Sequence, residues 1–250
     1  LFVEGVNSVV EGFTIRNGLT ASYGGGITLL CAGIVRDCLV TGNQAWGAGG
    51  IQMQADGAVV ENCTVQSNLA TYSGGGIMIY DATAGLVNNC IVRGNIASNY
   101  GGGVSLQGAG SASNCWIVDN RAVLSDAGGV DLVNGGRLIN SVVAGNQAGR
   151  DAGGVKNSGG TVAQCTVVSN MAGRDSGGMF TYYMSTSVNS IVYFNTAPTN
   201  ANLYPHWQSN LIRNCCTTTN VNLGASNFTN APTFADFAAR DFRLAAGSSC

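Results

Sequence analysis

A short motif recurs along this chain at an almost constant interval. In its commonest form it reads Asn-Cys-x-Val-x-x-Asn, as at 62–68 and 89–95. The second position of the motif falls at 13, 38, 63, 90, 115, 141, 165, 190 and 215, so successive copies lie 24 to 27 residues apart. Nine copies at one period indicate that the chain is built by stacking one supersecondary unit on the next.

A second motif keeps the same phase and shows that the unit is made of strands. It is Gly-Gly followed by an aliphatic residue, as at 49–51 and 153–155. Within the units apolar residues are spaced by two, as in 63–66, where Cys63 and Val65 alternate with polar residues. This spacing excludes a helical repeat and predicts short parallel strands, each coil lying about 4.8 Å from the next. The prediction is an all-β chain, a parallel β-helix (solenoid) of about nine coils of 24–27 residues.

Stacked coils place equivalent residues above one another, so the narrow interior should contain ladders of like residues. One aliphatic ladder is Val40, Val65, Val92, Ile117, Val143, Val167 and Val192. A second ladder is Cys38, Cys63, Cys90, Cys115, Cys165 and Cys215. Because Phe13, Ser141 and Ser190 occupy the same position, these cysteines are expected to be buried free thiols rather than disulfides.

Two further ladders are expected at the bends of each coil. The first is Asp37, Asn62, Asn89, Asn114, Asn140, Asn189 and Asn214, with Gly12 in the first coil. Gly, Asn and Asp tolerate a left-handed backbone, so a positive φ is predicted here. The second is Asn43, Asn68, Asn95, Asn120, Asn146, Asn170 and Asn195, whose amides can bond along the rod.

The repeat weakens near the C-terminus, which sets the expected domain boundaries. All three prolines and the single histidine, His206, come after position 195. Proline removes a ladder hydrogen bond, so 196–211 is expected to be a loop excursion from the coils. The interpretation is a β-helix over 1–220, with an incomplete N-terminal coil, and a C-terminal cap over 221–250.

Composition excludes several classes of protein. The chain has 45% apolar residues and a net charge of −2, which is unlike a disordered chain. Its single lysine, Lys156, argues against a nucleic-acid partner. No apolar run reaches the roughly 18 residues of a transmembrane segment, so none is expected in this chain.

These motifs resemble a known group of proteins. Gly-Phe-Thr-Ile at 12–15, the Gly-Gly-Ile/Val blocks and the Asn-Cys units resemble bacterial right-handed parallel β-helix repeat proteins, and the pattern is similar to polymorphic outer-membrane protein repeats. The resemblance implies a right-handed coil and an extracellular or cell-surface (outer-membrane) location on a bacterium. It leaves the activity open, because the same fold carries pectate lyases, polygalacturonases and adhesins.

One candidate site is an acidic column. Asp126, Asp151 and Asp175 recur at the coil spacing, and Arg150 and Arg174 precede two of them. Stacked carboxylates repel, so arginines, solvent or a calcium ion must offset them. The column is therefore either a solvated charged face or a calcium site, and no other cofactor is expected. Asp131 and Lys156 occupy equivalent outward positions on adjacent coils and should face each other.

The second candidate site is the outward face of the strand that follows each Gly-Gly block. Its polar and aromatic residues are Gln52, Gln54, Tyr80, Gln107, Asp131, Lys156 and Tyr182. Rings beside amides and carboxylates suit recognition of a polysaccharide or a cell-surface glycan. The alternative interpretation is that the rings only cover the glycine-rich backbone.

Together these features predict a secreted or cell-surface β-helix module with a structural, adhesive or glycan-binding role. The alternative is a polysaccharide-degrading enzyme, a pectate-lyase-like lyase. No catalytic residue is identified, because the chain lacks the Gly-His-Gly and Arg-x-Lys of polygalacturonases and its units are too uniform for long catalytic loops.

Overall fold

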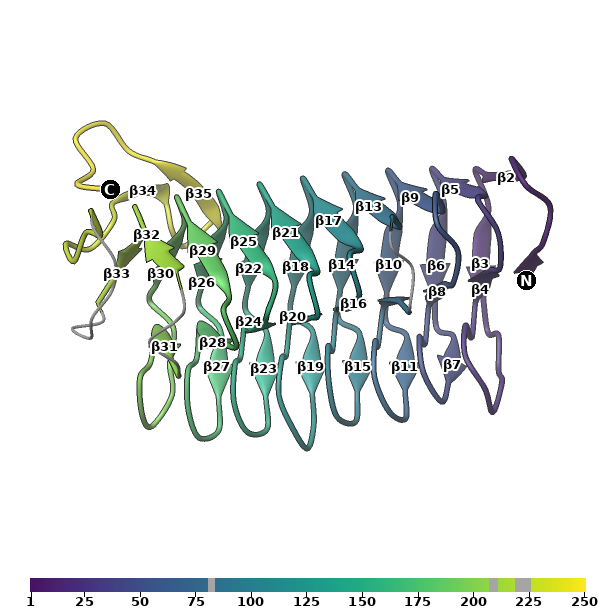
Figure 1. The fold of residues 1–250 in the computed structure, drawn as a ribbon, viewed down its shortest axis with the longest axis horizontal. Coiled ribbons are helices and arrows are strands. Elements are labelled where there is room, and N and C mark those ends of the chain that lie inside the picture. Colours follow the sequence, from purple (N-terminus) through teal and green to yellow (C-terminus); the bar gives the residue numbers. More distant parts are fainter. Residues whose placement is uncertain (81–83, 207–210, 219–225) are drawn as a thin grey trace.

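The chain forms a rod of stacked coils (Figure 1). The computed structural model describes residues 1–80, 84–206, 211–218 and 226–250. Each coil contributes strands of two to four residues to parallel sheets that run along the rod. In this part of the chain there are no helices, and therefore no helix that could cross a membrane. The prediction of an all-β solenoid is confirmed.

Within the described ranges, three sheets along the rod contain nine strands each, and a fourth contains six. Sheet A comprises β1 (Phe2–Val3), β4 (Ile27–Leu29), β8 (Ile51–Met53), β12 (Ile77–Ile79), β16 (Val104–Gln107), β20 (Val130–Val133), β24 (Val155–Ser158), β28 (Met179–Tyr182) and β31 (Leu203–Pro205). Sheet B comprises β2 (Val9–Glu11), β5 (Ile34–Arg36), β9 (Val59–Glu61), β13 (Leu86–Asn88), β17 (Ser111–Ser113), β21 (Arg137–Ile139), β25 (Thr161–Ala163), β29 (Thr186–Val188) and β32 (Leu211–Arg213). Sheet C comprises β3 (Thr14–Arg16), β6 (Leu39–Thr41), β10 (Thr64–Gln66), β14 (Ile91–Arg93), β18 (Trp116–Val118), β22 (Val142–Ala144), β26 (Thr166–Val168), β30 (Ile191–Tyr193) and β33 (Cys216–Thr217). Sheet D comprises β7 (Gln44–Ala45), β11 (Leu69–Ala70), β15 (Ile96–Ala97), β19 (Arg121–Ala122), β23 (Gln147–Ala148) and β27 (Met171–Ala172).

The register of the strands stacks like on like, as the repeat predicts. Val65 of β10 pairs with Val40 on one side and Val92 on the other. In sheet A, Ile77 pairs with Ile51 and Val104. These aliphatic side chains are fully buried and form one continuous core along the rod. Burial of stacked β-branched residues is what holds successive coils together.

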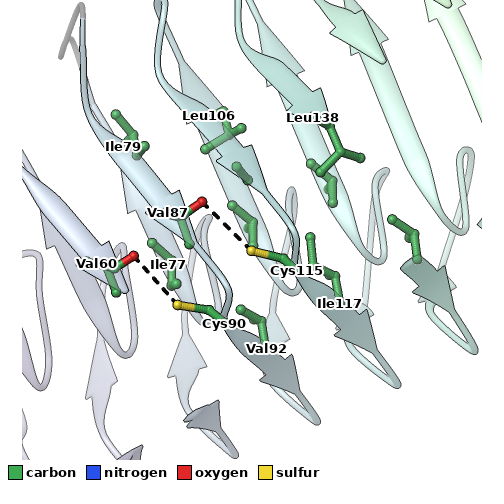
Figure 2. Close-up of a cluster of buried hydrophobic side chains, with 14 of the residues drawn as sticks. Val60, Ile77, Ile79, Val87, Cys90, Val92, Leu106, Cys115, Ile117 and Leu138 are labelled. Atoms are coloured by element: carbon green, nitrogen blue, oxygen red, sulfur yellow. Dashed lines mark hydrogen bonds between the residues drawn. The ribbon is translucent and has the colours of Figure 1, made fainter. Parts of the chain in front are cut away.

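The cysteine ladder packs against this core (Figure 2). The Cys90 thiol donates to the Val60 carbonyl of the preceding coil at 3.6 Å, and the Cys115 thiol donates to Val87 at 3.8 Å. Ser141 holds the same position and donates to the carbonyl two residues before it, as the cysteines do. All six ladder cysteines are buried free thiols, which confirms the prediction.

The two polar ladders occupy different environments. Asn62 has φ 53°, and equivalent residues in the other coils also have positive φ, as predicted, but their side chains are exposed. The second ladder is buried. The Asn68 Oδ1 accepts bonds from the backbone N–H and side-chain amide of Asn43 at 3.0 and 2.9 Å. Its Nδ2 donates to Val40 and Asn95, both at 3.0 Å. Each buried amide therefore joins three coils.

The Gly-Gly blocks mark the closest approach of neighbouring coils. A Cβ at Gly49 would lie 2.6 Å from the carbonyl oxygens of Gly75 and Leu69. Any side chain here would collide with backbone. The block therefore lets the chain turn tightly into sheet A, where the candidate site residues lie.

Part of the stretch 196–211, expected from the sequence to be a loop excursion, forms a strand, and residues 207–210 of it lie outside the described residues. Within it, β31 pairs in register with β28, so Leu203 stacks on Met179 and continues the core. Pro205 is tolerated because β31 is an edge strand of sheet A.

The C-terminal segment does more than close the end of the rod. Phe228 pairs beside β33, bonding to Cys215 at 2.8 Å and Thr217 at 2.9 Å, and so covers that edge of sheet C. Residues 226–250, here called the C-terminal arm, then form the antiparallel pair β34 (Phe234–Asp236) and β35 (Asp241–Leu244) beside the coils (Figure 1). A disulfide joins Cys216 to Cys250, a pairing that the repeat does not predict.

Candidate functional site

The outward face of sheet A divides into a buried part and an open part. Every second residue points away from the core, but Gln52 and Asp131 are only 1% and 5% exposed. These two residues are therefore not on the open glycan face that the sequence predicts. Gln54 and Tyr80 are exposed, Gln107 is half-buried, and none of the three lines the cleft described below.

The acidic column is present on three successive coils, and its first two carboxylates are held by arginines. Asp126 accepts from Arg150 Nε at 2.9 Å and from Nη2 at 2.8 Å. Asp151 is held in the same two-pronged way by Arg174, one coil later. Each arginine thus reaches back to the carboxylate of the preceding coil. Both aspartates are buried, whereas the arginines are largely exposed.

Lys156 stands in register with Asp131, as predicted, but its Nζ bonds to Asp126 Oδ2 at 3.1 Å and lies 4.7 Å from the centre of the Tyr100 ring. Burial alone would lower the pKa of Lys156, but the nearby Asp131 and Asp126 carboxylates outweigh it and raise the pKa. Burial would likewise raise the pKa of Asp126, yet Arg150 and Lys156 hold it below its ordinary value.

Asp131, the register partner of Lys156 on the preceding coil, is a buried carboxylate. Its Oδ1 has no hydrogen-bond partner among the described residues. Burial raises the pKa of Asp131 to about 6; attraction to Lys156 opposes this shift, and the Asp126 carboxylate adds to it. A buried carboxyl without a partner favours its neutral form.

The third carboxylate, Asp175, is not held by an arginine within the described part of the chain. It accepts from the Asn200 amide at 3.0 Å and from the Ser176 hydroxyl at 3.2 Å. Among the residues that the structure describes, no three acidic, histidine or cysteine side chains gather as metal ligands. In the structure, an arginine pairs with each of the first two carboxylates of the column.

Aromatic rings border this charged group on the C-terminal side. The centroid of the Tyr182 ring lies 4.7 Å from that of His206 and 6.1 Å from that of Phe180, and in both pairs the rings are stacked. His206, assigned from the sequence to a loop outside the coils, follows β31 and bonds through its N–H to Thr181. The 24-residue interval from Met179 to Leu203 is the signal that could have placed His206 beside Tyr182.

These groups enclose one cleft of about 350 Å³, here called the charged cleft. Its lining combines the arginine–aspartate pairs and Lys156 with the rings, and comprises Asp126, Arg150, Asp151, Lys156, Ser158, Arg174, Phe180, Tyr182, Tyr183 and His206. Of the residues predicted for a site, only Asp126, Asp151, Lys156 and Tyr182 meet here. The cleft offers fixed hydrogen-bond donors and acceptors beside flat apolar rings.

Comparison with known proteins bears on the fold. The family model described as "Right handed beta helix region" matches residues 1–148. A solved structure titled "Crystal structure of pectate lyase Pel9A" is 14% identical, with a TM-score of 0.45, over 98% of this chain and 82% of that chain. No curated protein matches the chain.

Proposed function

The chain belongs to the right-handed β-helix family, and from this premise we propose that it is a glycan-binding module of the cell surface or extracellular space. The observation that carries the proposal is the charged cleft, where the rings of Tyr182 and His206 stand next to two arginine–aspartate pairs. Sugar rings present apolar faces to aromatic side chains and hydroxyls to polar ones. The cleft supplies both kinds of contact within one space.

The construction of the site supports binding to a rigid surface. The cleft lies on strands and tight turns of four successive coils, and each coil is fixed by core ladders and buried amides. Groups held in this way lose little freedom when a ligand binds, which favours affinity. A repeated surface also suits a polymeric ligand that extends along the rod.

The disulfide supports the proposed location. Cys216 and Cys250 are joined, and such bonds persist mainly in oxidising compartments outside the cytosol. A bacterial source and attachment at the outer membrane remain part of the proposal, and they rest on the sequence resemblance alone.

A lyase is less well supported than a binding module. A lysine that abstracts a sugar proton must be neutral, but Asp131 and Asp126 raise the pKa of Lys156 and keep it protonated. Both arginines of the cleft are engaged with carboxylates. Among the described residues, Lys156, Arg150 and Arg174 are thus arranged to hold hydroxyl groups rather than to remove protons.

A glycan array followed by calorimetry on the best ligand tests the proposal. Tyr182→Ala should weaken binding at least about fivefold, the contribution of one aromatic contact. The matched control is Tyr193→Ala in sheet C, whose hydroxyl bonds to Thr229 on another face of the rod. Equal affinity in wild type and Tyr182→Ala would refute the cleft as the binding site. A product assay on the same ligand separates binding from cleavage.

A further inference from the structure

Every cation that lines the charged cleft already has a carboxylate partner. Arg150 Nη2 lies 2.8 Å from Asp126 and its Nε lies 3.5 Å from Asp151. Arg174 forks onto Asp151, and Lys156 Nζ lies 3.1 Å from Asp126. The cleft is therefore rich in charge, but each of these three cations is already paired with a carboxylate and is not free to bind an acidic ligand.

The balance of charge around the cleft points the same way. The lining has three cations, Arg150, Lys156 and Arg174, and two carboxylates, Asp126 and Asp151. Asp131 lies behind Lys156, and Asp175 follows Asp151 on the next coil, which brings the carboxylates to four. Even with Asp131 neutral, three carboxylates match the three cations, so the group has no excess positive charge to attract an anion.

An acidic ligand that displaced Asp126 or Asp151 from its arginine would break a pair whose acidic member is buried. The Asp126 and Asp151 side chains are only 4% and 6% exposed. Drawing an arginine away would leave a buried carboxylate without its counter-ion, which is strongly unfavourable. A ligand that binds without taking the arginines avoids this cost.

Hydroxyl groups meet that requirement. The bonds from Arg150 to Asp126 use two of the five guanidinium N–H donors, and a carboxylate has about four acceptor positions. The four acceptor positions of Asp126 are filled by Arg150, Lys156 and the Asp151 backbone N–H, so a sugar hydroxyl would instead accept from the remaining N–H donors of the exposed arginine while the pair stays intact. We infer that the ligand of the charged cleft is an uncharged, hydroxyl-rich glycan whose ring stacks on Tyr182. The inference rests on the proposed function and adds the chemical class of the ligand.

Matched polysaccharide pairs test this inference. Galactan is compared with polygalacturonate, and glucan with polyglucuronate, by calorimetry at low salt and at tenfold higher salt. The neutral member of a pair should bind at least about tenfold more tightly, and its affinity should change less than about twofold with salt. Tighter binding of the acidic member, weakened by salt, would overturn the inference but leave glycan binding intact. Binding of neither class would overturn the proposed function and the inference with it.

A charge-changing variant gives a second readout. Asp151→Asn removes the carboxylate that neutralises Arg174, so affinity for the acidic polymer should rise about fivefold, the factor for one unit charge at about 4 Å in water. Glu4→Gln makes the same change in net charge at an exposed position outside the cleft and should have no effect. If Asp151→Asn fails to fold, Asp175→Asn adds the same charge without releasing an arginine. Unchanged affinity for the acidic polymer in a folded Asp151→Asn protein would contradict the inference.

Discussion

Arg240 in the C-terminal arm donates hydrogen bonds to both carboxylate oxygens of Asp119, at 2.7 and 2.8 Å, across 121 residues of sequence. The pair ties the arm to the loop that follows β18 in sheet C. Phe234 and Phe242 of the arm pack on Val118, Ala144 and Val168 of the same sheet. Both charged side chains are about half exposed, so the pair alone contributes little and the apolar contacts hold the arm.

The first prediction separates these two contributions to the docking of the arm. Phe242→Ala should destabilise the docked arm by about 3 kcal/mol, because it removes a ring that is 9% exposed. Arg240→Ala should cost less than about 1 kcal/mol. Hydrogen exchange of peptides from 226–250 measures both effects. A larger loss of protection in Arg240→Ala would mean that the ion pair, and not the apolar contact, fixes the arm.

The second prediction concerns the thiols. Denatured protein should show seven reactive thiols before reduction and nine after it, because only Cys216 and Cys250 are bonded. Mass spectrometry after alkylation counts them. The seven comprise the six ladder cysteines and Cys31. Fewer than seven labelled sites before reduction would show that ladder cysteines pair with one another.

The sequence was sufficient to predict the ladders because stacking imposes them. When each coil repeats the last at one spacing, a residue such as Val65 must lie between its equivalents, and a bend such as Asn62 must share their backbone conformation. The same spacing placed Asp126 and Asp151 on neighbouring coils. Period alone therefore predicts backbone neighbours along the rod.

Period could not predict which partner a long side chain chooses. Lys156 stands beside Asp131 in register, yet its flexible stem carries the ammonium to Asp126. Nor does period say which outward positions are covered, and Gln52 and Asp131 proved to be buried. The arm and its disulfide lie outside the repeat, so no equivalent position in another coil could indicate where they dock.

The third prediction contrasts the two asparagine ladders. Asn68→Ala should destabilise by about 3–5 kcal/mol, because it leaves buried groups of Asn43, Asn95 and Val40 without their partner. Asn62→Ala should cost only about 1 kcal/mol, through its positive φ, since its bond to Asn89 is exposed. Asn62→Gly should be close to neutral. Denaturant unfolding of the three variants measures these values, and equal losses for Asn68→Ala and Asn62→Ala would refute the contrast.

The fourth prediction concerns the buried carboxyl of Asp131. Burial raises its pKa from the ordinary 3.8 to about 6, with Lys156 opposing and Asp126 adding to the shift. The folded state thus binds this proton more tightly than the unfolded state. The stabilisation is complete below about pH 4 and is lost as the pH rises through about 6, a difference of about 3 kcal/mol. Asp131→Asn keeps the shape without the charge, so it should be more stable than wild type at pH 7 and similar at pH 4. Urea unfolding of both proteins between pH 4 and 8, with exposed Glu4→Gln as control, measures the difference. A variant that is less stable than wild type at pH 7 would show that the charged Asp131–Lys156 attraction outweighs the cost of burying the carboxylate.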